Sequence, residues 1–326
     1  MKKILALLLA LWIPAAVLSG CAPQDDSAAS NKLNIVTTIF PAYDWVREIL
    51  GDETDRAEIT TLLDSGVDLH SYQPTVDDIV KISDCDLFLY VGGESDGWVE
   101  DALKNAPNKD RKVIRLLDVL GDSAKAEETV EGMQEEEHDH EEEAEYDEHI
   151  WLSLKNAQVL VAAISEALQE SDPARKDTYA ANAAAYVDKL SALDGEYRAA
   201  VDSGKYKALL FGDRFPFRYL ADDYGLDYYA AFPGCSAETE ASFETISFLA
   251  GKMDALGLPC VLTIESTQHK IAETIVQNTA QKNQQILTMD SMQAVTANDA
   301  ASGVSYLSIM EKNLSVLKKA LGQEAE

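Results

Sequence analysis

The chain has 326 residues, and its 57 acidic residues outnumber its 27 basic residues, which gives a formal net charge of −30 at pH 7. So large an acidic surplus argues against nucleic acid and against anionic membrane surfaces as partners, because both repel a negative protein. It is compatible with the capture of cations, although acidity alone usually serves only solubility.

The first thirty residues are typical of an exported lipoprotein. Two lysines precede an apolar run over residues 4–17, which is too short and wrongly flanked for a transmembrane helix. The run leads into Leu18-Ser19-Gly20-Cys21, which resembles the bacterial lipoprotein signal, in which the cysteine is lipidated and becomes the first residue. We therefore expect a signal peptide at 1–20, a lipid anchor on Cys21 and a polar tether at 21–30.

Beyond the tether, short β-branched or apolar runs alternate with helical patterns. This alternation predicts an α/β fold with mostly parallel sheets, divided into an N-terminal lobe at 31–170 and a C-terminal lobe at 203–326. The helical patterns include Pro41–Leu50, Thr75–Ile82 and Glu240–Leu256. The expected strands are Leu33–Thr38, Glu58–Leu63, Leu87–Val91 and Val113–Leu116 in the first half, and Ala208–Phe211, Tyr228–Phe232, Val261–Ile264 and Ile286–Met289 in the second.

A single long helix is predicted between the lobes, at 171–202. Ser171-Asp172-Pro173 supplies a capping residue and an early proline, both typical of a helix start. A stripe of apolar residues then recurs at steps of mostly four and three: Tyr179, Ala183, Tyr186, Leu190, Leu193, Tyr197 and Val201. A helix of this length spans about 45 Å and should limit hinge opening between the lobes. A coiled-coil interface is the less favoured alternative, because the stripe is short and rich in alanine.

The segment 127–148 holds thirteen acidic residues together with His138 and His140, and it contains no lysine or arginine. Such a composition cannot form a packed core, so it predicts a mobile loop. Two roles remain open for this acidic loop. It is either a solvated spacer or an antenna that collects cations loosely.

Three cysteines remain once Cys21 is set aside. An oxidising exterior permits one disulfide and leaves one thiol over. Cys235–Cys260 is the preferred pair, because both residues flank predicted strands, while Cys85 is interpreted as a buried small apolar residue. The sequence has no CxxC motif, so a zinc site built from thiolates is not expected.

Candidate metal ligands follow several of the predicted elements. His70 comes just past a strand-like run, and His149 ends the acidic loop where a helical pattern begins. Asp213, Glu265 and Asp290 follow three predicted strands of the second half. Because ligands bind beyond the carboxyl ends of strands in open α/β sheets, we expect these five side chains to meet in one cleft. Two imidazoles with carboxylates suit Zn²⁺ or Mn²⁺, and the imidazoles favour Zn²⁺.

Each carboxylate also has a simpler interpretation. Asp290 is a candidate helix cap, Glu265 a carboxylate stabilised at a helix start, and Asp213 a partner for Arg214. The joint placement of the five residues favours the metal site over these separate roles.

At these residues the chain resembles the zinc- and manganese-binding lipoproteins of ABC transporters, the group that includes the zinc-uptake binding proteins. The resemblance covers nearly the whole mature chain, and its most specific pieces are Gly66–Pro74 and Asp147–Ser153. Further matching pieces are Val36–Pro41, Tyr224–Leu226, Met289–Asp290 and Tyr306–Leu314. The resemblance implies two α/β lobes joined by a long helix, with the metal between them. It also implies that His70, His149 and Asp290 lie at ligand positions.

One departure from the family pattern concerns the third ligand. The resemblance places that ligand, a histidine in zinc binders and a glutamate in manganese binders, at Arg214, whose guanidinium cannot bind a cation. Three possibilities remain open. Asp213 is the ligand and Arg214 turns away; Glu265 completes the shell while Arg214 ion-pairs with a carboxylate such as Asp213; or Arg214 holds an anion or a metal–chelate.

The function implied is a lipid-anchored solute-binding protein that captures Zn²⁺, in preference to Mn²⁺, and delivers it to an ABC permease. We expect a monomer and no enzymatic activity. A secreted metallohydrolase with Glu265 as its base is the remote alternative, but the chain has no HExxH, nucleophile or phosphate-loop motif. A surface adhesion protein that uses the acidic loop is a third hypothesis, and no feature singles it out.

Overall fold

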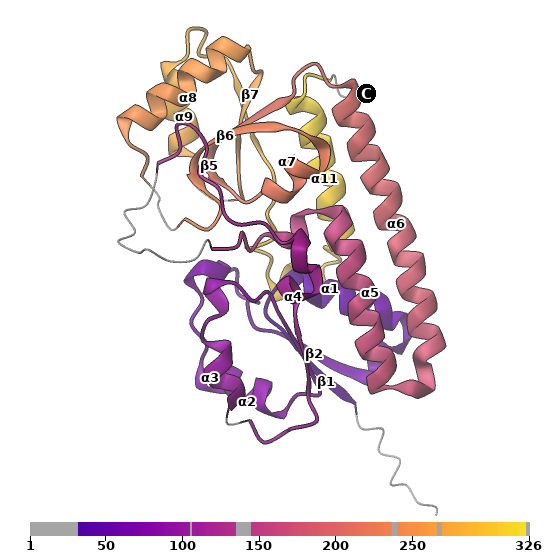
Figure 1. Ribbon diagram of the computed structural model, residues 1–326. Helices are drawn as coiled ribbons and strands as arrows, with labels where there is room; N and C mark the ends of the chain where they lie inside the picture. Colours follow the sequence, from indigo (N-terminus) through magenta and orange to yellow (C-terminus); the bar gives the residue numbers. More distant parts are fainter. Residues whose placement is uncertain (1–31, 105, 135–144, 237–239, 266–268, 324–326) are drawn as a thin grey trace, which may run out of the picture. The chain divides into compact units, whose positions relative to one another are not determined.

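The computed structural model describes residues 32–104, 106–134, 145–236, 240–265 and 269–323 (Figure 1). The predicted signal peptide, Cys21 and the tether lie outside these ranges, as do His138 and His140. From Lys32 onward the chain forms one compact unit. Within the described ranges, none of the helices combines the length and the apolar character needed to cross a bilayer.

The first sheet is parallel and has the strand order β2-β1-β3-β4. The two central strands are mostly apolar and buried because helices cover both faces of a parallel sheet, whereas each edge strand carries charged residues. The strands are β1 (Leu33–Thr37), β2 (Ala57–Thr61), β3 (Leu87–Tyr90) and β4 (Lys112–Arg115). The helices of this half are α1 (Phe40–Leu50), α2 (Val76–Asp84), α3 (Val99–Lys104) and α4 (Leu116–Leu120).

The second sheet repeats this arrangement, with parallel strands in the order β6-β5-β7-β8. In both sheets the second strand lies on one side of the first and the third strand on the other, which opens a crevice at their carboxyl ends. The strands are β5 (Ala208–Phe215), β6 (Asp227–Pro233), β7 (Cys260–Thr263) and β8 (Gln285–Thr288). The helices are α7 (Arg218–Tyr224), α8 (Phe243–Leu256), α9 (Lys270–Asn278), α10 (Ala297–Ala301) and α11 (Tyr306–Ala320).

All eight predicted strands are present, and all but one end within two residues of the predicted end. Strand β5 continues to Phe215, four residues beyond the predicted end at Phe211, and its register with β6 shifts between Phe211 and Arg214. Gly212 permits this path, because a Cβ there would lie 2.6 Å from the Cα of Ala272 in α9. Asp213 and Arg214 therefore lie within the strand and do not follow it.

Two long helices follow the first sheet and precede the second in chain order, and they pack side by side: α5 (Leu154–Ser171) and α6 (Lys176–Ser203) (Figure 1). The predicted apolar stripe of α6 is buried within this chain, so it is not a coiled-coil interface. The helix α6 begins later than predicted, because Pro173–Arg175 forms a separate 3₁₀ turn. It packs against α1 and α5 and also against α7 and α11, so it contacts helices from both halves.

Cys85, Cys235 and Cys260 are all free thiols, so the prediction of a Cys235–Cys260 disulfide was wrong. Both residues flank strands of one parallel sheet, but they lie at opposite ends of it. Cys260 begins β7, whereas Cys235 follows the carboxyl end of β6. Cys85 is buried, as predicted, and its thiol donates to the carbonyl oxygen of Ile82 at 3.1 Å.

The described ends of the acidic loop, 127–134 and 145–148, are held by backbone hydrogen bonds. The amide of Glu127 donates to the carbonyl of Glu145 at 2.7 Å, and the amide of Gln134 donates to the carbonyl of Ala231 at 2.9 Å. Met133 is buried. These contacts attach the loop to the C-terminal half, while residues 135–144 lie outside the described residues and their predicted mobility stays a prediction.

Candidate metal site

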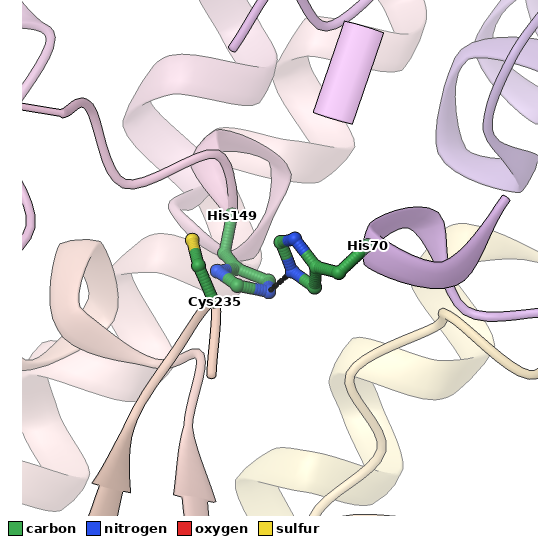
Figure 2. A group of neighbouring side chains, drawn as sticks. All are labelled: His70, His149 and Cys235. Atoms are coloured by element: carbon green, nitrogen blue, oxygen red, sulfur yellow. Dashed lines mark hydrogen bonds between the residues drawn. The ribbon is translucent and has the colours of Figure 1, made fainter. Parts of the chain in front are cut away.

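Three side chains from separate segments converge beyond the ends of the two sheets: His70, His149 and Cys235 (Figure 2). One ligand atom from each lies within 4.8 Å of the other two. The Nε2 atoms of the two imidazoles are 3.2 Å apart. In the part of the chain that the structure describes, no other group of three histidine, cysteine or acidic side chains is gathered so closely.

His70 is held by the short 3₁₀ helix η2 (Leu69–Ser71) in the loop after β2. The Asp68 carboxylate caps this turn and accepts the amide N–H of His70 at 3.0 Å. The Nδ1 atom of His70 lies 2.9 Å from the hydroxyl of Ser95 and 3.4 Å from Oε2 of Glu148. Burial, reinforced by the neighbouring His149, lowers the pKa of His70 to about 3, so the ring is neutral and able to bind a metal near neutral pH.

His149 is fully buried at the end of the acidic loop, just before the 3₁₀ turn η5 (Ile150–Leu152). Oδ1 of Asp147 accepts both the backbone N–H of His149 at 2.8 Å and its ring Nδ1–H at 2.9 Å. A carboxylate only accepts, so Nδ1 carries the hydrogen and Nε2 presents its lone pair to the group. A carboxylate behind a histidine in this way fixes the tautomer and orientation of a metal ligand.

The facing imidazoles favour a cation between them. When Nδ1 of His70 donates its hydrogen to the hydroxyl of Ser95, the Nε2 atoms of both rings are acceptors. Two acceptors 3.2 Å apart repel each other, and a divalent cation bound to both relieves that repulsion.

Cys235 is a residue that the sequence analysis did not place in the site. It lies two residues beyond β6, and its backbone N–H donates to Oε1 of Glu127 at 2.8 Å. The preceding Gly234 allows the close approach, because a Cβ there would lie 2.9 Å from the carbonyl oxygen of Phe215 and 3.1 Å from Nδ1 of His149. Burial raises the pKa of the Cys235 thiol well above its usual value, and nearby carboxylates raise it further. The sequence could have pointed to Cys235, because it follows a predicted strand just as the predicted carboxylate ligands do.

The three predicted carboxylate ligands lie outside this group, and each accepts backbone hydrogen bonds. Asp213 accepts the amide of Arg214 at 2.9 Å. Glu265 accepts the amide and hydroxyl of Ser291, both at 2.6 Å, and Asp290 accepts the amide of Met292 at 2.8 Å. Burial and the nearby Asp290 together raise the pKa of Glu265 to about 6. Their assignment as ligands stays a prediction.

Arg214 ion-pairs across the two halves of the chain. Its Nη2 lies 2.5 Å from Oδ2 of Asp68, and its Nη1 donates to the carbonyl of Ser236 at 3.2 Å. Burial alone would raise the pKa of Asp68, but the guanidinium outweighs it, so the net shift is downward. Of the three possibilities for Arg214, an ion pair with a carboxylate is the one present, but its partner is Asp68 and not Asp213.

A cavity of about 550 Å³ adjoins the group. Glu148 lies in its wall and is 2% exposed; Oε1 accepts the amide of Ser95 at 2.8 Å, while Oε2 has no hydrogen-bond partner in the described structure. Burial raises the pKa of Glu148 to about 7. The cavity therefore offers acidic groups to an incoming cation, and its other lining residues include Glu94, Glu127, Glu145, Tyr72 and Trp98.

Comparisons with known proteins identify the family and the fold. Residues 35–320 match the family described as "Zinc-uptake complex component A periplasmic", ZnuA. The chain belongs to the ZnuA family. It is 33% identical to the zinc-binding lipoprotein AdcA of Streptococcus pneumoniae over 99% of its own length, and it spans 62% of that relative. It is also 29% identical to the high-affinity zinc uptake system protein ZnuA of Bacillus subtilis, over 89% of this chain and 88% of that one.

The solved Zn(II)-bound ZnuA-like domain of Streptococcus pneumoniae AdcA has the same fold. It superposes with a TM-score of 0.69 at 30% identity, covering 90% of this chain and all of that one. The resemblance stated from the sequence and the predicted two-lobe α/β architecture are thereby confirmed. The family is a metal-binding component of transport systems.

Proposed function

We propose that this chain is the extracytoplasmic solute-binding component of a zinc importer, which captures Zn²⁺ and delivers it to an ABC permease. The observation that carries this function is the pair of Nε2 atoms of His70 and His149, which face each other at 3.2 Å with Asp147 fixing the ring behind one of them. Imidazole nitrogen favours Zn²⁺ over Mn²⁺, which prefers oxygen ligands.

The attachment and assembly of the protein belong to the same proposal. The Leu18–Cys21 motif supports a lipid anchor on Cys21, which would hold the protein at the outer face of the cell membrane. A monomer suffices, because both histidines come from one chain. Zinc serves as cargo and not as a catalyst, so we propose no enzymatic activity.

The three carboxylates remain candidates for further ligands. Asp213, Glu265 and Asp290 accept the amides of Arg214, Ser291 and Met292, and a carboxylate has lone pairs left over with which it can bind a metal. A metal–chelate or an anion is the less favoured cargo. Arg214 is occupied by Asp68, and the adjoining cavity is lined by carboxylates that repel anions.

The test is a calorimetric titration of the soluble chain from Ala22 at pH 7.5 with Zn²⁺ and with Mn²⁺. We expect one tight zinc site, weaker manganese binding, and loss of the zinc site in His70→Ala and in His149→Ala. His269→Ala removes a histidine outside the group and should leave zinc binding unchanged. A protein without a tight zinc site, or one that keeps it in both histidine variants, would show that the proposed function is wrong.

A further inference from the structure

We infer that the thiolate of Cys235 is the third zinc ligand and that it completes a site of two imidazoles and one thiolate with His70 and His149. This inference rests on the proposed function and names the donor set that gives the site its metal preference. Neither the sequence resemblance nor the predicted carboxylates assign a role in metal binding to this residue.

The spacing of the three side chains fits a tetrahedral zinc ion. Zn–N bonds of about 2.05 Å place two coordinating nitrogens roughly 3.3 Å apart, and a Zn–S bond of about 2.3 Å places sulfur roughly 3.6 Å from each nitrogen. The Nε2 atoms of His70 and His149 are 3.2 Å apart. One ring nitrogen of each histidine lies within 4.8 Å of the Cys235 sulfur, so a small movement of these side chains closes the site.

The surroundings of Cys235 hold its sulfur near the two rings. The backbone of Glu148, the residue directly before His149, lowers the pKa of the Cys235 thiol, although burial outweighs this effect. The backbone N–H of Cys235 is itself fixed by Glu127 at 2.8 Å. Gly234 lets this segment pass close to the ring of His149. The sulfur is therefore positioned by the segments that also position His149.

The other candidates for a third ligand are engaged elsewhere. The guanidinium of Arg214 lies against Asp68. Asp213, Glu265 and Asp290 all accept backbone amides. None of these four belongs to the close group, whereas Cys235 does.

The binding step balances in charge and atoms. The thiol S–H bond breaks, the sulfur forms a bond to Zn²⁺, and the proton passes to a buffer base in solvent, so one proton is released for each zinc ion bound. The thiolate offsets one of the two positive charges of the ion. Sulfur is a poor ligand for Mn²⁺ and a good one for Zn²⁺, so Cys235 increases the difference in affinity between Zn²⁺ and Mn²⁺ that the imidazoles already produce.

The first test replaces zinc with Co²⁺ in the soluble chain from Ala22 and records the near-ultraviolet spectrum. A cobalt–thiolate bond gives an intense charge-transfer band that nitrogen and oxygen ligands do not give. We expect the band in the wild type and in Cys260→Ala, which removes a thiol remote from the site, and its loss in Cys235→Ser. In Cys235→Ser the dissociation constant for Zn²⁺ should rise at least 100-fold, whereas that for Mn²⁺ should change less than threefold.

A second measurement needs no variant and therefore does not depend on the folding of Cys235→Ser. The half-buried Cys235 should be alkylated by iodoacetamide in the zinc-free wild type and protected when Zn²⁺ is bound, with the site mapped by mass spectrometry. Alkylation that zinc does not slow would overturn the inference.

The outcomes separate this inference from the proposed function. Loss of zinc binding in His70→Ala, together with an unchanged zinc affinity and cobalt spectrum in Cys235→Ser, refutes the thiolate and leaves the zinc-capture function intact. Absence of a tight zinc site in the wild type refutes the proposed function itself. Loss of both the band and the affinity in Cys235→Ser supports both.

Discussion

The substitution Asp147→Asn tests whether the carboxylate behind His149 serves the metal. Asp147 is 1% exposed, and its Oδ1 accepts two hydrogen bonds from His149, one from the backbone and one from the ring. Asparagine retains the shape and one acceptor but removes the charge. A charge-assisted hydrogen bond is roughly twice as strong as a neutral one, and the imidazole of His149 becomes more positive when it binds Zn²⁺. The loss therefore falls mainly on the zinc-bound state.

Removal of a carboxylate behind a metal-binding histidine typically weakens metal affinity by about 10–100-fold, or about 1.4–2.8 kcal/mol. We expect a zinc dissociation constant raised by that factor at pH 7.5, measured by competition with a chromophoric chelator. Asp44→Asn is the matched control, because Asp44 is a buried carboxylate that accepts the amide of Tyr306. A folded Asp147→Asn protein that binds zinc within threefold of the wild type would refute the reasoning, as would an equal loss in Asp44→Asn.

Three further predictions concern packing and stability. Tyr197→Phe should lower the free energy of unfolding in urea by about 1 kcal/mol, because its hydroxyl donates to the buried carbonyl of Met310 at 2.7 Å. Tyr186→Phe on the same helix should be near neutral, because that buried hydroxyl has no hydrogen-bond partner among the described residues; equal losses would contradict this. Gly234→Ala should weaken zinc binding and lower the free energy of unfolding by about 1–3 kcal/mol, because the new Cβ meets the Phe215 carbonyl at 2.9 Å. The control Gly251→Ala in α8 has open space and should be neutral or stabilising, and wild-type zinc affinity in Gly234→Ala would contradict this. Burial raises the pKa of Asp44 from 3.8 to about 6, so the folded state binds this proton more tightly than the unfolded state, and the resulting stability is gained as pH falls and lost as pH rises through 6. The zinc-free chain should therefore gain about 1 kcal/mol of unfolding free energy from this group between pH 7.5 and 5.5, and urea titrations in which Asp44→Asn shows the same gain would exclude the assignment.

The strands could be predicted from the sequence because each is a short run rich in β-branched or apolar residues, bounded by turn-forming or helical segments. Parallel strands covered on both faces are apolar throughout, so the signal is local. The end of β5 could not be predicted in the same way. The strand continues past Phe211 because Gly212 lies against Ala272 of α9, and that contact joins residues sixty positions apart.

The two histidines could also be predicted, because each stands at the end of an element where ligands bind in open sheets. Cys235 follows β6 at the corresponding end, but the sequence analysis assigned it to a disulfide with Cys260, because an oxidising exterior favours disulfides. That pair is too far apart because the two residues lie at opposite ends of the sheet, which the sequence alone does not show. The partner of Arg214 was out of reach for a similar reason. Asp68 lies 146 residues earlier, and only the packing of the two halves brings it opposite the guanidinium.

The ion pair between Arg214 and Asp68 joins the two halves of the chain next to the site. Asp68 also caps the turn that holds His70, so the loop that carries one histidine is tied through this acid to strand β5 of the second sheet. In Arg214→His the carboxylate would fix one ring nitrogen and leave the other to bind a metal, as Asp147 does for His149. Movement of the loop away from the second sheet would have to break the ion pair, so this pair of charges couples the position of His70 to the packing of the two halves.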